Sequence, residues 1–101
     1  MKTTIQEKDG KTTVTVTGEL DTNTSPKFQA DVAPLMTREG LDVELDLEGL
    51  DYISSKALRI IISLQQAVVA NKGTVRITKV SPSVREVFDM TGLSKSFLLL
   101  D

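Results

Sequence analysis

The sequence predicts a single α/β domain over residues 1–101, with a mixed, mainly parallel β-sheet and helices packed on one side. Strand patterns and helix patterns alternate along the chain, and strands separated by helices are expected to run parallel through right-handed crossovers. In the segment 42–48, apolar residues alternate with Asp and Glu, so one sheet face is expected to be apolar and the other exposed to solvent. A sheet covered on both faces would instead show continuous apolar runs. With 101 residues and 40% hydrophobic content, the chain can build one core.

The first 18 residues are predicted to form a β-hairpin. Val14 and Val16 alternate with threonines, which is typical of a half-buried strand, and Gly18 is expected to end this strand. Asp9–Gly10 is a strong turn signal that separates it from a strand near Thr3–Lys8.

Thr24–Pro26 are predicted to begin a helix that runs to about Thr37. A capping hydroxyl precedes the proline, and proline suits the first helical turn. Pro34 lies inside this helix, so we expect a kink or an early end. The buried face is expected to contain Phe28, Val32 and either Leu35 or Met36.

The segment between strands 42–48 and 74–78 is predicted to be the central helix. It begins at Ser54 or Ser55, either of which can cap it, and it ends at Asn71–Gly73, where glycine is expected to supply the left-handed residue. Its apolar stripe, at helical spacing, contains Ala57, Leu58, Ile61, Ile62, Leu64, Val68 and Val69.

A third helix and a last strand complete the predicted order β-β-α-β-α-β-α-β. Ser81 is expected to cap this helix, with Pro82 in its first turn and Gly92 at its end. Its predicted buried residues are Val84, Val87 and Phe88. The segment Phe97–Leu100 is predicted to be a short strand.

Composition excludes several classes of function. With 12 Lys and Arg against 14 Asp and Glu, the net charge of −2 lacks the basic excess that nucleic acid or an anionic membrane surface would need. Without His or Cys, the chain cannot form a Ser-His-Asp triad, a thiolate nucleophile, a disulfide or a Cys-ligated zinc site. No apolar run is long enough to cross a bilayer and no signal segment opens the chain, so a cytoplasmic location is expected.

No cofactor, metal ion or catalytic residue is predicted. The glycines fit neither phosphate-binding nor dinucleotide-binding spacing. The acidic row Asp42, Glu44, Asp46 and Glu48 forms a ladder along one strand rather than a cage. Arg76 or Lys79 on a neighbouring strand could balance these charges, so we interpret the row as a solvated sheet face.

Ser54 and Ser55 stand where a strand gives way to the central helix. Free backbone N–H groups and the positive end of the helix dipole meet at such a point, so a phosphate on either hydroxyl would be tolerated, with Lys56 helping to screen it. The alternative is that both serines serve only as helix caps.

Three motifs together resemble a STAS domain of the bacterial anti-sigma factor antagonist type. They are Thr17–Asp21 followed by Thr24, the turn Ile53–Leu58, and the segment Ser81–Leu93. The resemblance covers almost the whole chain in the right order. It implies a phosphorylation-controlled binding module without catalysis, which binds a serine-kinase anti-sigma factor, frees the sigma factor and is restored by a PP2C-type phosphatase.

The resemblance also assigns roles to residues. The family's phosphate acceptor is the first hydroxyl residue of an aspartate-serine-serine/threonine-glycine-leucine turn, and it falls on Ser55, with Ser54 as the second candidate. This chain has Ser54, Lys56 and Ala57 where the family has aspartate, a hydroxyl residue and glycine, so the local charge is two units more positive. The implied partner-binding residues are Asp21, Asn23, Ser54, Ser55 and Lys56.

Other interpretations stay open from the sequence. Asp21 could serve only local hydrogen bonds ahead of the first helix. The domain could be a subunit of a larger assembly, such as a lipid-transport complex, in which Ser55 only caps the helix. An enzyme such as a nucleotide hydrolase has little support without a base, a phosphate-binding loop or a metal cage. We expect a monomer that binds neither nucleic acid nor membrane.

Overall fold

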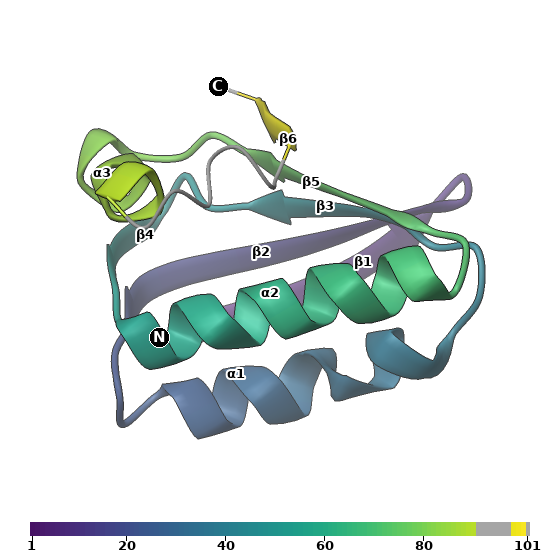
Figure 1. The fold of residues 1–101 in the computed structure, drawn as a ribbon, viewed down its shortest axis with the longest axis horizontal. Coiled ribbons are helices and arrows are strands. Elements are labelled where there is room, and N and C mark those ends of the chain that lie inside the picture. Colours follow the sequence, from purple (N-terminus) through teal and green to yellow (C-terminus); the bar gives the residue numbers. More distant parts are fainter. Residues whose placement is uncertain (91–97, 101) are drawn as a thin grey trace.

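The computed structural model describes residues 1–90 and the short strand 98–100 (Figure 1). The elements are β1 (Lys2–Lys8), β2 (Lys11–Leu20), α1 (Ser25–Val32), the 3₁₀ helix η1 (Ala33–Thr37), β3 (Asp42–Asp46), β4 (Leu50–Ile53), α2 (Ser55–Ala70), β5 (Thr74–Thr78), α3 (Pro82–Met90) and β6 (Leu98–Leu100). The predicted end of the third helix at Gly92, and Phe97 at the start of the last strand, lie outside the described residues.

The sheet is mixed and mainly parallel, as the sequence predicts. Its strands lie in the order β1-β2-β3-β5-β6, and β4 pairs with the far part of β2. The β1–β2 pair is antiparallel, whereas every other pair is parallel. Helices α1 and α2 lie side by side against one face, and α3 lies at the end of the sheet near β4 (Figure 1).

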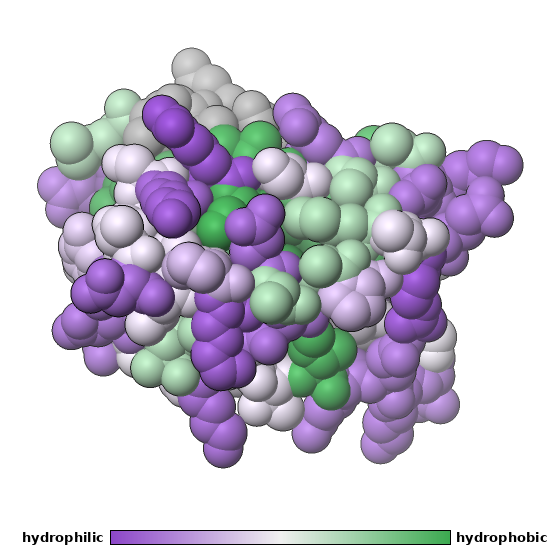
Figure 2. Space-filling model, turned by 90° about the horizontal axis from the view of Figure 1, so that it is seen from below, coloured by the Kyte–Doolittle hydropathy of each residue, from purple (hydrophilic) through white to green (hydrophobic). Residues whose placement is uncertain are grey.

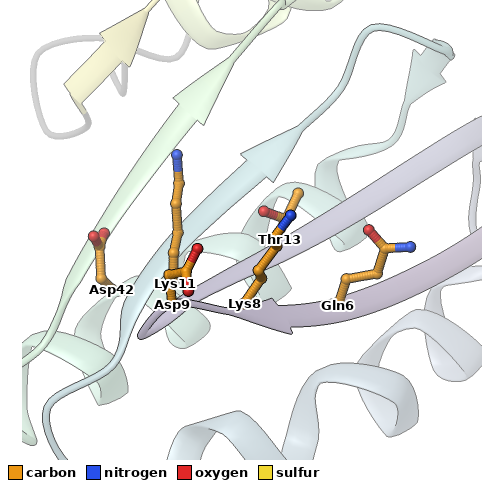
Figure 3. Close-up of a pocket in the computed structure, with 6 residues that line it drawn as sticks. All are labelled: Gln6, Lys8, Asp9, Lys11, Thr13 and Asp42. Atoms are coloured by element: carbon orange, nitrogen blue, oxygen red, sulfur yellow. The ribbon is translucent and has the colours of Figure 1, made fainter.

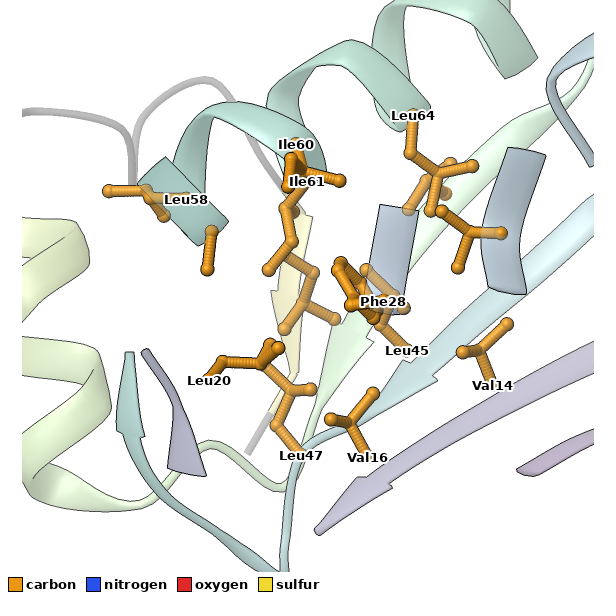
Figure 4. Packing of buried hydrophobic residues seen from close by; sticks show 14 of the residues in the cluster. Val14, Val16, Leu20, Phe28, Leu45, Leu47, Leu58, Ile60, Ile61 and Leu64 are labelled. Atoms are coloured by element: carbon orange, nitrogen blue, oxygen red, sulfur yellow. The ribbon is translucent and has the colours of Figure 1, made fainter. Parts of the chain in front are cut away.

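One face of the sheet is apolar and the other is charged, which confirms the one-sided arrangement. The core lies between the sheet and the α1–α2 layer, where side chains such as Val14, Leu45, Phe28 and Ile61 are fully buried (Figure 4). The surface of the helix layer is mostly polar, with apolar side chains scattered over it (Figure 2). Among the described residues, no helix is long and apolar enough to cross a membrane.

The acidic row lies on the open face and is paired with cations. Arg76 contacts Asp42 at 3.0 Å and Lys79 contacts Asp46 at 3.6 Å, as the sequence predicts, while Lys11 contacts Glu44. The bond from Lys11, together with one from the Thr78 hydroxyl, lowers the pKa of Glu44. Strand β3 is shorter than predicted, since it ends at Asp46 rather than at Glu48.

Two expectations about β2 and its neighbour are corrected. The turn forms at Asp9–Gly10 with positive φ at both residues, as the signal predicts, but β2 does not end at Gly18. Gly18 has φ +91° and marks an irregularity after which the strand continues to Leu20. Beyond it β2 pairs with β4, a strand that the sequence analysis missed because its apolar residues, Leu50 and Ile53, do not alternate.

The helices follow the predicted spans with local differences. Helix α1 ends at Val32 and η1 continues to Thr37, because Pro34 cannot donate a helical hydrogen bond. Helix α2 closes through Lys72, which has φ +67°, rather than through Gly73. Gly73 is needed because a Cβ there would collide with the Leu41 carbonyl oxygen.

Two residues predicted to be buried are more exposed than expected. Val69 near the end of α2 is 51% exposed, and Val87 in α3 is half-buried. Val84 and Phe88 are buried as predicted, and the Ser81 hydroxyl accepts the Val84 N–H at 3.4 Å, which confirms the cap.

Candidate functional site

The predicted site residues gather at one end of the molecule. The carboxyl end of β2, the loop that follows it, the start of α2 and helix α3 all meet there (Figure 1). Pairing of Leu20 with Ile53 aligns the two strands, and the Ser54 N–H donates to the Leu20 carbonyl at 2.7 Å. The Ser81 hydroxyl donates to the Leu50 carbonyl at 3.3 Å, which ties α3 to the same end.

The two serines have different environments. Ser54 is the N-cap of α2 in extended conformation, it is only 8% exposed, and its hydroxyl accepts the Ala57 N–H at 3.2 Å. Ser55 is the first residue of the helix and is exposed. The capping alternative therefore applies to Ser54, and Ser55 presents its hydroxyl to solvent without serving as the cap.

The loop beside this turn is organised by Asp21. Its carboxylate accepts the N–H groups of Asn23 and Thr24, both at 2.9 Å, and these bonds lower the pKa of Asp21, with the Thr24 N–H as the largest cause. The local hydrogen-bonding role is thus present in the structure. Asn23 is exposed at the tip of the loop.

Thr24 does not cap α1 with its side chain, contrary to the sequence expectation. Its hydroxyl lies 2.9 Å from the Glu19 carbonyl and accepts the Asp21 N–H at 2.9 Å. Ser25 is buried, and its hydroxyl donates to the Asp21 carbonyl at 2.5 Å. All of these bonds join residues within the segment 19–25. They stabilise the reversal of the chain between β2 and α1.

Sequence reasoning missed two exposed residues at this end. Tyr52 in β4 pairs with Glu19 and is 50% exposed. Arg59 is exposed one helical turn after Ser55. The sequence did offer one signal for Arg59: it lies four residues after Ser55, and residues at this spacing are neighbours on a helix surface.

A surface hollow of about 540 Å³ lies away from this site, beside the β1–β2 hairpin (Figure 3). It is lined by Gln6, Lys8, Asp9, Lys11, Thr13 and Asp42. Two of these residues, Lys11 and Asp42, are already engaged in ion pairs. None of the predicted site residues contributes to it, so the hollow is separate from the serine turn.

The exposed Ser55 hydroxyl is the group of this turn that could accept a phosphate. Within residues 1–90 no group of three or more acidic side chains is arranged to hold a metal ion. Asp21 accepts both backbone N–H groups at the same carboxylate oxygen, Oδ1.

Comparisons with known proteins agree with this fold. A family model described as "STAS domain" matches residues 2–101. BtrV of Bordetella bronchiseptica, named as a candidate anti-sigma factor antagonist, is 30% identical over 97 residues, which are 96% of this chain and 84% of BtrV. An anti-sigma factor antagonist from Mycobacterium paratuberculosis superposes with a TM-score of 0.88 at 24% identity, covering 98% of this chain and 84% of that one. The phosphorylated form of SpoIIAA from Bacillus superposes with a TM-score of 0.75 at 17% identity, covering 97% and 90%.

Proposed function

The chain belongs to the STAS domain family, and from this premise we propose that it is an anti-sigma factor antagonist controlled by phosphorylation of Ser55. Unphosphorylated, it binds a serine-kinase anti-sigma factor and so releases the sigma factor. The binding surface contains Asp21, Asn23, Ser55 and Lys56, and the buried Ser54 holds the start of α2 beneath it. Phosphorylation ends the binding, and a PP2C-type phosphatase restores it.

The exposure of Ser55 carries the proposal. Its hydroxyl stands at the surface, whereas the neighbouring Ser54 is buried and its oxygen accepts a backbone N–H. A kinase that approaches this end of the molecule would therefore meet Ser55. SpoIIAA, which has the same fold, has been solved in a phosphorylated form, and this supports the same regulation here.

The reaction is an ordinary phosphoryl transfer. The Ser55 Oγ forms a bond to the γ-phosphorus of ATP, the bond from that phosphorus to the β-phosphate oxygen breaks, and ADP leaves. The hydroxyl proton passes to a base of the kinase. Hydrolysis by the phosphatase returns the hydroxyl and releases inorganic phosphate.

A phosphate on Ser55 should leave the fold intact and weaken binding. It adds a charge of roughly −1.5 to −2 at a helix start, where anions are tolerated, yet this charge lies in the middle of the binding surface. The protein is thus a binding switch, and the catalysis belongs to its partners.

We expect Ser55→Asp to fold normally but to bind the cognate kinase-type anti-sigma factor at least ~10-fold more weakly, a loss of about 1.4 kcal/mol. Ser63→Asp is the matched control, because Ser63 is also exposed on α2 but lies two turns further on. The dissociation constant of the control should stay within about 3-fold of the wild-type value, well below the ~10-fold increase expected for Ser55→Asp. Titration calorimetry measures both.

Incubation with the partner and ATP should add one phosphate, and peptide mass spectrometry should place it on Ser55. Wild-type affinity of Ser55→Asp, together with no phosphate on Ser55, would overturn the switch. In that case Ser55 would be only a surface residue of the helix start.

A further inference from the structure

We infer that Arg59, assisted by Lys56, binds the phosphate of phosphorylated Ser55 within the same chain, so that phosphorylation stabilises the domain while it ends partner binding. This inference rests on the proposed function for its biological role. It goes beyond that function because it assigns a phosphate-holding residue and a mechanism by which the cations are withdrawn from the partner.

The first observation is the pairing state of the cations. Five cationic side chains on the described surface contact carboxylates, namely Lys11, Lys27, Arg38, Arg76 and Lys79. Over residues 1–90, neither Lys56 nor Arg59 lies within ion-pair distance of a carboxylate. Both are exposed, and both lie in the first two turns of α2 beside Ser55.

The second observation is the position of Arg59 relative to Ser55. Residues four apart on a helix are neighbours, with about 5–6 Å between their Cβ atoms. Side chains on a helix lean toward its N-terminus, so the guanidinium is expected to reach back over the turn that begins with Ser55. An anion that precedes a cation by four residues is also the more favourable order.

The third observation is that Ser54 and Asp21, the other polar groups of this site, already make hydrogen bonds of their own. Ser54 is neutral, and its hydroxyl oxygen already accepts the Ala57 N–H. Asp21 accepts two backbone N–H groups of its own loop at Oδ1, and within the described residues it forms no ion pair with Lys56 or Arg59. A guanidinium can give a phosphate two parallel N–H···O bonds, which an ammonium cannot.

Charge balance follows from these positions. Two uncompensated cations face a phosphate of roughly −1.5 to −2, so the phosphorylated turn is close to neutral. A partner that uses Lys56 and Arg59 in the unphosphorylated form would lose both when the phosphate captures them. Release would then involve loss of attraction as well as repulsion.

The test uses the full chain with phosphoserine incorporated at position 55 during translation, so that no kinase is needed. Melting temperature is compared between phosphorylated and unphosphorylated forms of the wild type, of Arg59→Gln and of Lys8→Gln. Lys8 is the matched control, since it is exposed, lacks an ion pair within the described residues and lies on β1.

Phosphorylation should raise the melting temperature of the wild type and of Lys8→Gln by about 2–4 °C, the scale of a modest surface ion pair in a domain of this size. The increase should fall by more than half in Arg59→Gln, recover in part in Arg59→Lys, and shrink in about 1 M salt. Because each variant is compared with its own unphosphorylated form, a change in basal stability cancels.

An equal increase in Arg59→Gln would overturn the inference, because the helix start alone would then account for the effect. A decrease on phosphorylation of the wild type would also overturn it. Failure of a kinase to modify Ser55 would contradict the proposed function but would leave this measurement unaffected, so the two failures are distinguishable.

Discussion

Ser54 and Ser55 are adjacent in the chain, yet a single peptide unit separates a buried cap from an exposed hydroxyl. The chain is extended at Ser54, with φ −88° and ψ 164°, and helical from Ser55 onward. An N-cap in extended conformation directs its side-chain oxygen toward the free N–H groups of the first turn. Ser55, the next residue, is already helical, does not serve as the cap and is exposed to solvent.

This division predicts different stabilities for two alanine variants. Ser54→Ala removes the bond to the Ala57 N–H and should lower the free energy of unfolding by about 1 kcal/mol. Ser55→Ala should change it by less than about 0.5 kcal/mol, as expected for an exposed residue without such a bond. Urea unfolding followed by circular dichroism measures both. Equal losses would contradict the assignment of the cap.

At the scale of elements, the close of α2 depends on two neighbouring residues with separate tasks. Lys72 adopts the left-handed conformation, and its N–H donates to the Val69 carbonyl at 3.0 Å. Gly73 provides space, since its backbone lies against Leu41 and the Val68 side chain. The glycine is thus required for close approach to the segment that leads into β3, and the lysine carries the conformational cost.

Lys72→Gly should therefore stabilise the protein by about 0.5–1 kcal/mol, because relief of the left-handed strain exceeds the entropy cost of the glycine. Gly73→Ala should destabilise it by about 1–3 kcal/mol, as overpacking does. Chemical denaturation of the two variants gives both values. A loss of stability in Lys72→Gly would contradict the left-handed conformation of Lys72 as a source of strain.

At the scale of the whole molecule, the fold depends on the difference between the two faces of one sheet. Along β3, Leu45 is fully buried against the helix layer, while Glu44 on the opposite face contacts Lys11 and Thr78. Hydrophobic burial on one face contributes most of the stability, whereas ion pairs on the open face contribute little in water. The open face can therefore remain charged without a covering layer.

We expect Leu45→Asp to abolish folding, because a buried carboxylate without a partner costs several kcal/mol and a small domain has only about 5–15 kcal/mol to lose. Glu44→Gln, one residue away, should cost less than about 1 kcal/mol. Thermal melting and the dispersion of amide NMR signals distinguish the outcomes. Similar behaviour of the two variants would remove the basis of the one-sided architecture.

The sequence by itself determined the kinds of element, the order of all of them except β4, and the sidedness of the sheet. Apolar periodicity is a local property, so the alternation around Leu45 and the stripe of α2 could be recognised without coordinates. Proline and the Asp9–Gly10 turn act within a few residues, so η1 and the first hairpin could be anticipated. The position of Ser55 at the start of the central helix could be predicted for the same reason.

The tertiary structure alone decided the features that depend on residues far apart in the chain. Strand β4 forms because its backbone pairs with the end of β2 beyond Gly18. Its four residues show no apolar alternation from which a strand could be predicted. Gly73 could be read as a helix terminator, but its closeness to Leu41 appears only after folding. The separate roles of Ser54 and Ser55 depend likewise on the bond from Ser54 to the end of β2, because backbone pairing across the sheet sets which serine is buried and which is exposed.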